Sequence, residues 1–357
     1  MSNWSGVLLG GLGVLLVGVG VYVWSSHTEH HAHFGTGLSG EALAPMEEHL
    51  DRIILRVRAE ENIPVADTTP AAPDGPHSQW FYSEPVSFAT DKRIVGMEAR
   101  ILDADTDVLH HLAVGLVNRP ATLCTMHFAQ SSGMHELYIT SRQALDPVEL
   151  PAPYALLVRA GEAIGVEFMT HAQAAPHGGH GAHEALQPTL EITLFTDDTR
   201  THEAHFVRLR LDDTPCEDPL AHQAFVVPAE TEAFTKRSSV AEIGGSARYE
   251  LRQSGQILAA GANFWPRKGG ESVTGYLNDV PFHTFTAEPG AESWQHNIPH
   301  LTNLISFAAG DVLTLSSVYR NPGPTPVLDA AGMLSVYYTF DQLIAQTDTA
   351  TEPEESE

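Results

Sequence analysis

The sequence predicts an all-β protein with two tandem jelly-roll or β-sandwich domains, preceded by an N-terminal transmembrane helix and a short amphipathic helix. Short β-rich runs recur between residues 79 and 340, and Gly, Pro, Asp and Asn separate them. No long helical period interrupts these runs. The region spans roughly 260 residues, which is long for one sandwich, so we expect two.

The chain begins with an uncharged run of 19 residues, positions 6 to 24, made mostly of Val, Leu and Gly. This length suits a bilayer core of roughly 30 Å, and Trp4, Tyr22 and Trp24 stand where interfacial aromatic residues belong. A cleaved signal peptide is the alternative, but no Lys or Arg precedes the run and no Ala-x-Ala motif follows it. We predict an uncleaved anchor over residues 1–26. Its Gly6 and Gly10 have a GxxxG spacing that suits a membrane-protein partner.

Residues 27–78 are predicted to connect this anchor to the β region. Four histidines come first and could hold a metal loosely, although a polar linker is the preferred interpretation: His27, His30, His31 and His33. Apolar residues then recur with helical spacing between 41 and 61, which predicts an amphipathic helix. They are Leu43, Met46, Leu50, Ile53, Ile54 and Val57. Four prolines between 62 and 78 indicate a linker.

The predicted strands cover residues 94–101, 109–117, 154–158, 164–169, 190–195, 206–211, 256–260, 312–319 and 333–340. The Asp- and Thr-rich segment 196–201 is the expected seam, giving domains at 79–198 and 199–342. The acidic tail, 343–357, is expected to be disordered.

The composition limits the function classes. Among 357 residues, 45 are acidic and 19 basic, and the net charge of −26 argues against nucleic acid as a partner. Cys124 and Cys216 could form one disulfide in an oxidising compartment, but their spacing does not decide it. The 20 histidines are numerous and clustered.

His110 and His111 are neighbours in an otherwise apolar run, 108–118. Adjacent residues of a regular strand point to opposite faces, so both cannot fill one core. In the simpler interpretation, one histidine faces solvent and the other is hydrogen-bonded in the core. The other interpretation is a metal site, because imidazole is the commonest metal ligand. His171 ends a second apolar run, so a fold that brought it beside His110 would create a three-imidazole site for copper or zinc. A Gly-rich loop supplies accessory metal candidates: His177, His180 and His183.

The order of several motifs resembles the copper type II, ascorbate-dependent monooxygenases, the family of peptidylglycine α-hydroxylating monooxygenase and dopamine β-monooxygenase, and most closely its bacterial members. Leu109-His-His-Leu-Ala-Val resembles the His-His motif of the family, and Phe168-Met-Thr-His resembles the segment that carries the third histidine. Ser293-Trp-Gln-His-Asn resembles a Trp-Gln motif. The segments that start at Ala309, Tyr319 and Gly332 follow in the family order. Together these matches span most of residues 79–340.

The resemblance implies two copper ions, one in each β domain. The first, an electron donor, would be held by His110, His111 and His171. The second activates oxygen and needs two histidines and a methionine, but Asn263 and Trp265 stand where the histidines belong. A thioether alone is a weak ligand, so Met333 cannot hold the metal by itself.

Other family signatures around Met333 are also missing, because Ala331, Gly332 and Leu334 replace them. A rebuilt second site could use the remaining histidines of this half, which are His283, His296 and His300.

The leading hypothesis is therefore a membrane-anchored, extracytoplasmic (periplasmic) relative that keeps one copper ion and lacks hydroxylase activity. It would serve in electron transfer, in copper binding or as a structural subunit of a membrane complex. The alternative is an active copper- and ascorbate-dependent monooxygenase acting on a small organic substrate. A third possibility is a structural module without metal, for which His110 and His111 should lie far from His171.

Overall fold

The structure is a computed structural model that describes residues 22–24, 50–58, 78–102, 109–117, 134–141, 147–171, 189–211, 225–238, 247–264, 268–287, 295–297, 300–341 and 343–344. All regular elements in these ranges are strands, which confirms the all-β prediction. Within the same ranges no helix is long and apolar enough to cross a membrane. The predicted anchor is wrong at its C-terminal end, because Tyr22–Trp24 form strand β1 and pair with residues 54–56. The rest of the anchor, most of the proline-rich linker, both cysteines and most of the acidic tail lie outside the described residues.

The first half is an eight-strand jelly roll. One sheet has the order β2 (Asp51–Arg58), β11 (Thr189–Thr196), β5 (Lys92–Ile101) and β9 (Tyr154–Val158), with β8 (Val148–Glu149) on β5 and β1 (Tyr22–Trp24) on β2. The other has the order β3 (Ser78–Tyr82), β10 (Ala163–His171), β6 (Leu109–Leu116) and β7 (His135–Ser141), with β4 (Val86–Ser87) on β10. Numbered along the chain without the short strands β1, β4 and β8, the eight main strands have the order 1-8-3-6 in one sheet and 2-7-4-5 in the other. This is the double Greek key of a jelly roll.

The second half repeats this order. Its first sheet is β12 (His202–Leu211), β23 (Gly332–Thr339) and β16 (Gly255–Phe264), with β19 (Gln295–Asn297) and β20 (His300–Phe307) both on β16. Its second sheet is β14 (Thr231–Arg237), β21 (Val312–Asn321), β17 (Gly270–Leu277) and β18 (Val280–Thr286), with β15 (Arg248–Glu250) on β21. A small pair, β13 (Phe225–Val227) and β22 (Val327–Ala330), adds to this half. The predicted tandem jelly rolls are therefore present.

The amphipathic helix predicted for residues 41–61 is wrong over residues 51–58, which form strand β2. All eight residues of β2 pair with β11. Leu55 and Val57 are buried while Arg52 and Arg56 are exposed, so the local period is two rather than 3.6. Arg56 and Arg100 hold the buried carboxylate of Glu191 on β11, at 2.8 and 2.7 Å. The first jelly roll therefore starts at β2, before the predicted boundary at residue 79.

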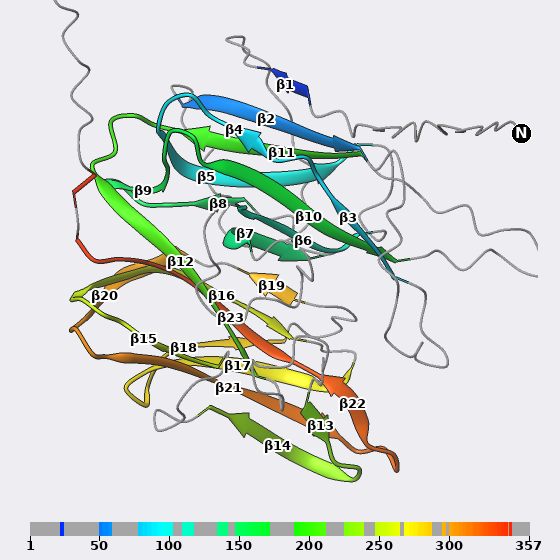
Figure 1. Ribbon diagram of the computed structural model, residues 1–357. Coiled ribbons are helices and arrows are strands. Elements are labelled where there is room, and N and C mark those ends of the chain that lie inside the picture. The colour runs from blue at the N-terminus through cyan, green and yellow to red at the C-terminus, as the bar shows by residue number, and fades with distance from the viewer. Residues whose placement is uncertain are drawn as a thin grey trace, which may run out of the picture.

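The two jelly rolls share one sheet. β12 pairs in parallel with β9 between residues 202–204 and 154–156, so their first sheets join into one sheet of 11 strands. Figure 1 shows the result as four stacked layers, from β2 at the top to β14 at the bottom. The second sheet of the first roll is thereby enclosed by the two halves of the joined sheet.

The central layer of β12, β23 and β16 has two different buried faces. Val207, Leu209 and Val336 face the core of the second roll. Phe206, Leu258 and Tyr337 instead belong to the core cluster of the first roll. The Tyr337 hydroxyl donates a hydrogen bond of 2.9 Å to the Leu137 carbonyl on β7. The chain crosses from one roll to the other between β11 and β12, within the predicted seam, but the rolls share a packed interface.

Candidate metal site

The backbone places the two predicted histidine segments on neighbouring strands. β6 and β10 are antiparallel, with His111 opposite Met169 and Leu109 opposite Thr170. Met169 and Thr170 are consecutive on β10, but their partners His111 and Leu109 are two positions apart on β6. His110 is therefore the extra residue of a β-bulge. A bulge interrupts the strict alternation of side chains, so adjacent histidines need not face opposite sides at this point of β6.

His171 ends β10, two residues beyond Met169, and is in register with Ser78 on β3. His110, His111 and His171 therefore lie at the same end of paired strands, which are ~4.8 Å apart in a sheet. The side chains of these three histidines are outside the described part of the structure. The backbone arrangement fits three imidazole donors, a donor set suited to copper or zinc. The accessory loop with His177, His180 and His183, and the histidines at 27–33, also lie outside the described residues.

The residues predicted for a second metal lie on the opposing layer. Asn263 on β16 is directly opposite Met333 on β23, and Met333 is opposite Arg210 on β12. Asn263 and Met333 are only 2% and 4% exposed. Met333 packs with Ala331 in a small cluster apart from the two main cores. An amide and a thioether do not form a donor set for copper. Trp265 lies outside the described residues.

The three other histidines of this half occupy different places. His296 on β19 is in register with Asn263, so it lies in the same row as Met333, and His300 on β20 is in register with Ala259. The side chains of His296 and His300 are not described. His283 lies on β18, in the bottom layer, where its ring contacts Phe285 with a centroid distance of 4.5 Å. The central sheet separates His283 from the face that carries Met333, because Phe285 belongs to the second-roll core and Met333 does not.

A buried charged cluster, Glu136–Arg208–Glu167, lies between the two rolls and was missed from the sequence. Arg208 on β12 donates to Glu136 on β7 at 2.7 Å, with side chains only 3% and 5% exposed. Glu167 on β10 is 1% exposed, and neither of its carboxylate oxygens has a hydrogen-bond partner among the described residues. The sequence signal was a charged residue inside an apolar run, Val166-Glu-Phe-Met, and another in Phe206-Val-Arg-Leu.

Burial determines how this cluster ionises. Loss of solvation raises the pKa of Glu136, and the nearby Arg208 guanidinium opposes this rise. Burial, together with the negative charge of Glu136, raises the pKa of Glu167 to about 9 despite the opposing effect of Arg208. The pKa of Arg208 is lowered by burial despite both carboxylates. Because two carboxyl groups share one guanidinium, we expect Glu167 to be the neutral member at pH 7.

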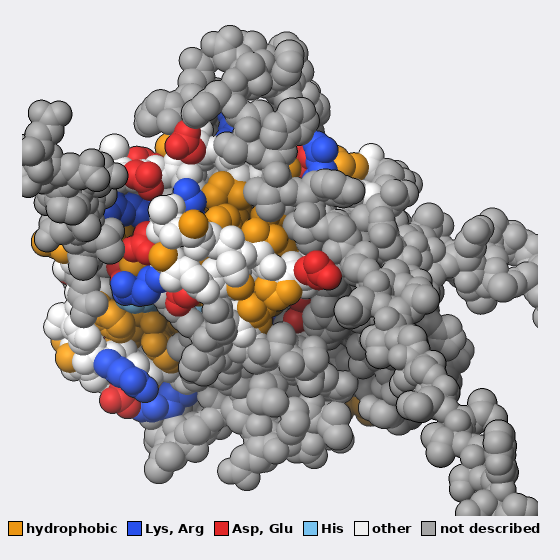
Figure 2. Space-filling view, turned by 45° about the horizontal axis from the view of Figure 1, so that its top comes forward, with side chains coloured by type: hydrophobic (Ala, Val, Ile, Leu, Met, Phe, Trp, Pro, Cys, Tyr) orange, Lys and Arg blue, Asp and Glu red, His pale blue; other side chains and the backbone are white. Residues whose placement is uncertain are grey.

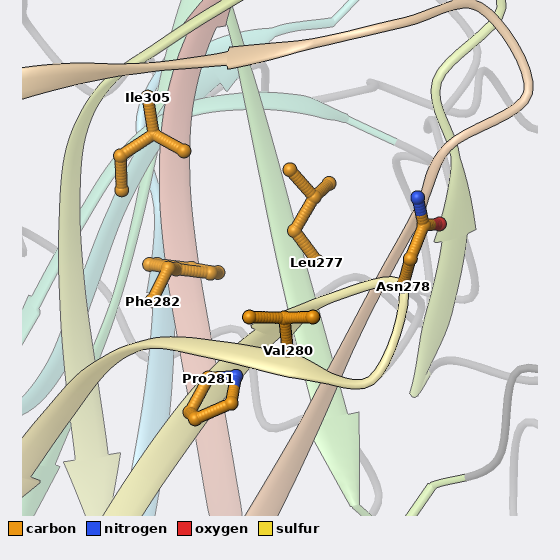
Figure 3. A pocket seen from close by; sticks show the side chains of 6 residues that line it. All are labelled: Leu277, Asn278, Val280, Pro281, Phe282 and Ile305. Atoms are coloured by element: carbon orange, nitrogen blue, oxygen red, sulfur yellow. The ribbon is translucent and has the colours of Figure 1, made fainter.

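A shallow apolar groove opens on the far layer. Leu277, Val280, Phe282 and Ile305 turn toward a common space beside the β17–β18 turn (Figure 3), with a volume of ≈ 510 Å³. This groove contains none of the predicted metal ligands. In the space-filling view, which brings the top of Figure 1 forward, basic and acidic side chains lie interspersed among exposed apolar ones (Figure 2). The described part of that face thus presents no patch of a single charge sign.

No family model and no curated protein matches this chain. Among solved structures it is similar to the major capsid protein P2 from bacteriophage PM2, with 8% identity, a TM-score of 0.31, and coverage of 83% of this chain and 99% of that one. It is also similar to the PBCV-1 virus capsid, with 9% identity, a TM-score of 0.29, and coverage of 76% of this chain and 98% of that one. For PNGF-II the identity is 8% and the TM-score 0.29, with coverage of 91% of this chain and 66% of that one. These values carry no argument about function, and the jelly-roll assignment rests on the strand order.

Proposed function

We propose that the protein binds a single copper ion through His110, His111 and His171 and does not hydroxylate a substrate. Its role would be to hold copper or to transfer electrons as the extracytoplasmic part of a membrane complex, anchored by the apolar segment that precedes β1. The observation that carries the proposal is the bulge at His110, in the strand pair that also contains His171. Bulges are frequent next to functional sites, where they redirect a side chain.

The chemistry of the two candidate sets supports one ion rather than two. Three neutral imidazoles are a sufficient donor set for copper, which when bound would supply one-electron redox chemistry. The row of Arg210, Met333, Asn263 and His296 offers a single imidazole beside a guanidinium, a thioether and an amide, and the guanidinium repels a cation. Oxygen activation needs an open metal position near the substrate, and this row does not provide one.

Copper content of the full-length protein, solubilised in detergent, loaded with Cu²⁺ and dialysed, tests this proposal. We expect one retained copper per chain, lost in His171→Ala and in His111→Ala. His283→Ala is the matched control, because it removes an imidazole from the other roll and should leave copper content unchanged. Retention of copper by His171→Ala, or no retained copper in the unaltered protein, would contradict the proposal.

A second candidate function is an active monooxygenase, and the register of His296 favours it. His296 pairs with Asn263, which pairs with Met333, so a histidine and the methionine occupy one row of the central layer. This function predicts two coppers per chain and ascorbate-dependent oxygen uptake that His296→Ala abolishes. One copper per chain and no oxygen uptake would exclude it.

A further inference from the structure

The contact between the two jelly rolls contains a buried carboxyl group that forms no hydrogen bond within the described part of the structure. This group, Glu167, comes from the enclosed sheet of the first roll, and Arg208 comes from the first strand of the second roll. Among the described residues, both oxygens of Glu167 and one oxygen of Glu136 are buried without a hydrogen bond. A carboxylate in this state forfeits its solvation, whereas a neutral carboxylic acid forfeits much less.

Two charged groups of neighbouring strands act on Glu167 electrostatically, Glu136 on β7 and Arg208 on β12. Tyr337 on β23 lies near Glu136 and near Tyr138 on β7, and Arg210 follows Arg208 by two residues on β12. In its own sheet Glu167 pairs with Ala113 and with Tyr82, and His111 lies two residues from Ala113. The side chains of Tyr82 and His111 are outside the described part. Arg208 is already committed to Glu136 at 2.7 Å.

We propose that the interface is a proton-dependent lock, in which Arg208 joins the two rolls through Glu136 while Glu167 remains a neutral carboxylic acid. Loss of the Glu167 proton puts two negative charges beside the Glu136–Arg208 pair in a space that excludes water. The repulsion and the cost of desolvation are relieved when the layers separate and water enters. The chain would then loosen between β7 and β12 in alkaline solution, with each roll still folded. This inference requires no metal and is independent of the proposed function.

Infrared spectroscopy of the full-length protein tests the protonation half of the proposal. A buried neutral carboxylic acid has a carbonyl stretch that ionised carboxylates lack. We expect this band at pH 7, its loss in alkaline solution, and its absence from Glu167→Gln at pH 7 and above, where exposed carboxyl groups are ionised. The control Glu271→Gln removes an exposed carboxyl group on β17 and should retain the band. If the unaltered protein has no such band at pH 7, Glu167 is ionised and the proposal fails.

Hydrogen exchange between pH 7 and pH 10 tests the lock. After correction for intrinsic exchange, protection of amides in β7, β12 and β23 should fall at least about tenfold as the band disappears, and protection in β5 and β11 should not change. Glu167→Gln should keep its interface protection at both pH values. Constant protection in the unaltered protein while the band is lost would overturn the lock, and so would an equal fall in Glu167→Gln. If that variant does not fold, the titration of the unaltered protein alone decides both halves.

Discussion

The two jelly rolls have the same strand order but carry different residues on the layers that face each other. In the first roll, the pair β6–β10 contains a bulge at His110 and ends at His171. In the second roll, Asn263 and Met333 lie in regular register on β16 and β23 and are buried. Equivalent topology therefore does not bring equivalent chemistry, because function depends on particular side chains. The interface between the rolls also contains buried charge, whereas the core of the second roll is apolar.

Breaking the charged cluster should have the largest effect on stability. Arg208→Met leaves Glu136 buried and without its partner, so we expect a loss of about 3–5 kcal/mol in the free energy of unfolding. Urea unfolding measures it. Arg320→Met is the control, because the Arg320–Glu232 pair is exposed and should be worth less than about 1 kcal/mol. The double variant Arg208→Met with Glu136→Leu should recover much of the loss. A loss below about 1 kcal/mol for Arg208→Met alone would show that the interface admits water.

The edge of the first roll should depend on β2, the strand that the sequence assigned to a helix. Leu55 is 1% exposed, so Leu55→Ala should cost about 2–5 kcal/mol. Arg52→Ala, on the exposed face of the same strand, should change stability much less. A chain that begins at residue 78 lacks β2 and should unfold at lower urea than one that begins at residue 49. Equal midpoints for these two chains would mean that β2 is not part of the roll.

The interface predicts a pH dependence of stability that Glu167 dominates. The pKa of Glu167 is raised from 4.5 to about 9, so between these values the unfolded chain has released this proton and the folded chain retains it. The contribution of Glu167 to the free energy of unfolding is therefore fully present below about pH 4.5. It falls as pH rises toward 9, by up to about 1.4 kcal/mol per pH unit. Glu167→Gln should flatten this slope in urea unfolding at pH 6, 7 and 8. If the slope of stability against pH is the same in Glu167→Gln as in the unaltered protein, another group causes the pH dependence.

A surface carboxylate of the second roll should show the opposite and smaller dependence. Asp311 accepts hydrogen bonds from the Ala308 amide at 2.7 Å and from the Asn278 side chain at 2.6 Å. These bonds lower the pKa of Asp311 below the usual 3.8. The stabilisation that they give is therefore present above pH 3.8 and is lost as the pH falls through the lowered pKa. Because the group is exposed, Asp311→Asn should cost under about 1 kcal/mol. Thermal unfolding at pH 7 and pH 3 measures the difference in stability between the unaltered protein and Asp311→Asn, and we expect this difference to be smaller at pH 3.

Much of the strand content could be predicted because buried strands leave a strong local pattern. The predicted strands at 190–195 and 333–340 correspond to β11 and β23 within one or two residues. β17 and β18 were missed because Gly275 and exposed threonines weaken their alternation. Residues 51–58 were predicted to be helical because Ile53, Ile54 and Val57 fit the spacing of a helix as well as that of a strand.

The candidate site was less accessible to prediction. The histidines could be identified as ligand candidates by residue type, but the bulge at His110 depends on its register with Met169, about 60 residues away. The contact between Glu136 and Arg208 joins strands from different rolls, 72 residues apart. No local pattern encodes such pairings, because they arise when two separately patterned sheets pack face to face.

Pulsed EPR of the full-length protein with one equivalent of Cu²⁺ tests the central claim most directly, because it detects imidazole nitrogens bound to the copper. We expect coupling to several imidazoles in the unaltered protein, the same coupling in Met333→Leu, and fewer coupled imidazoles in His171→Ala. A spectrum that changes in Met333→Leu but not in His171→Ala would place the metal in the second roll and contradict this account.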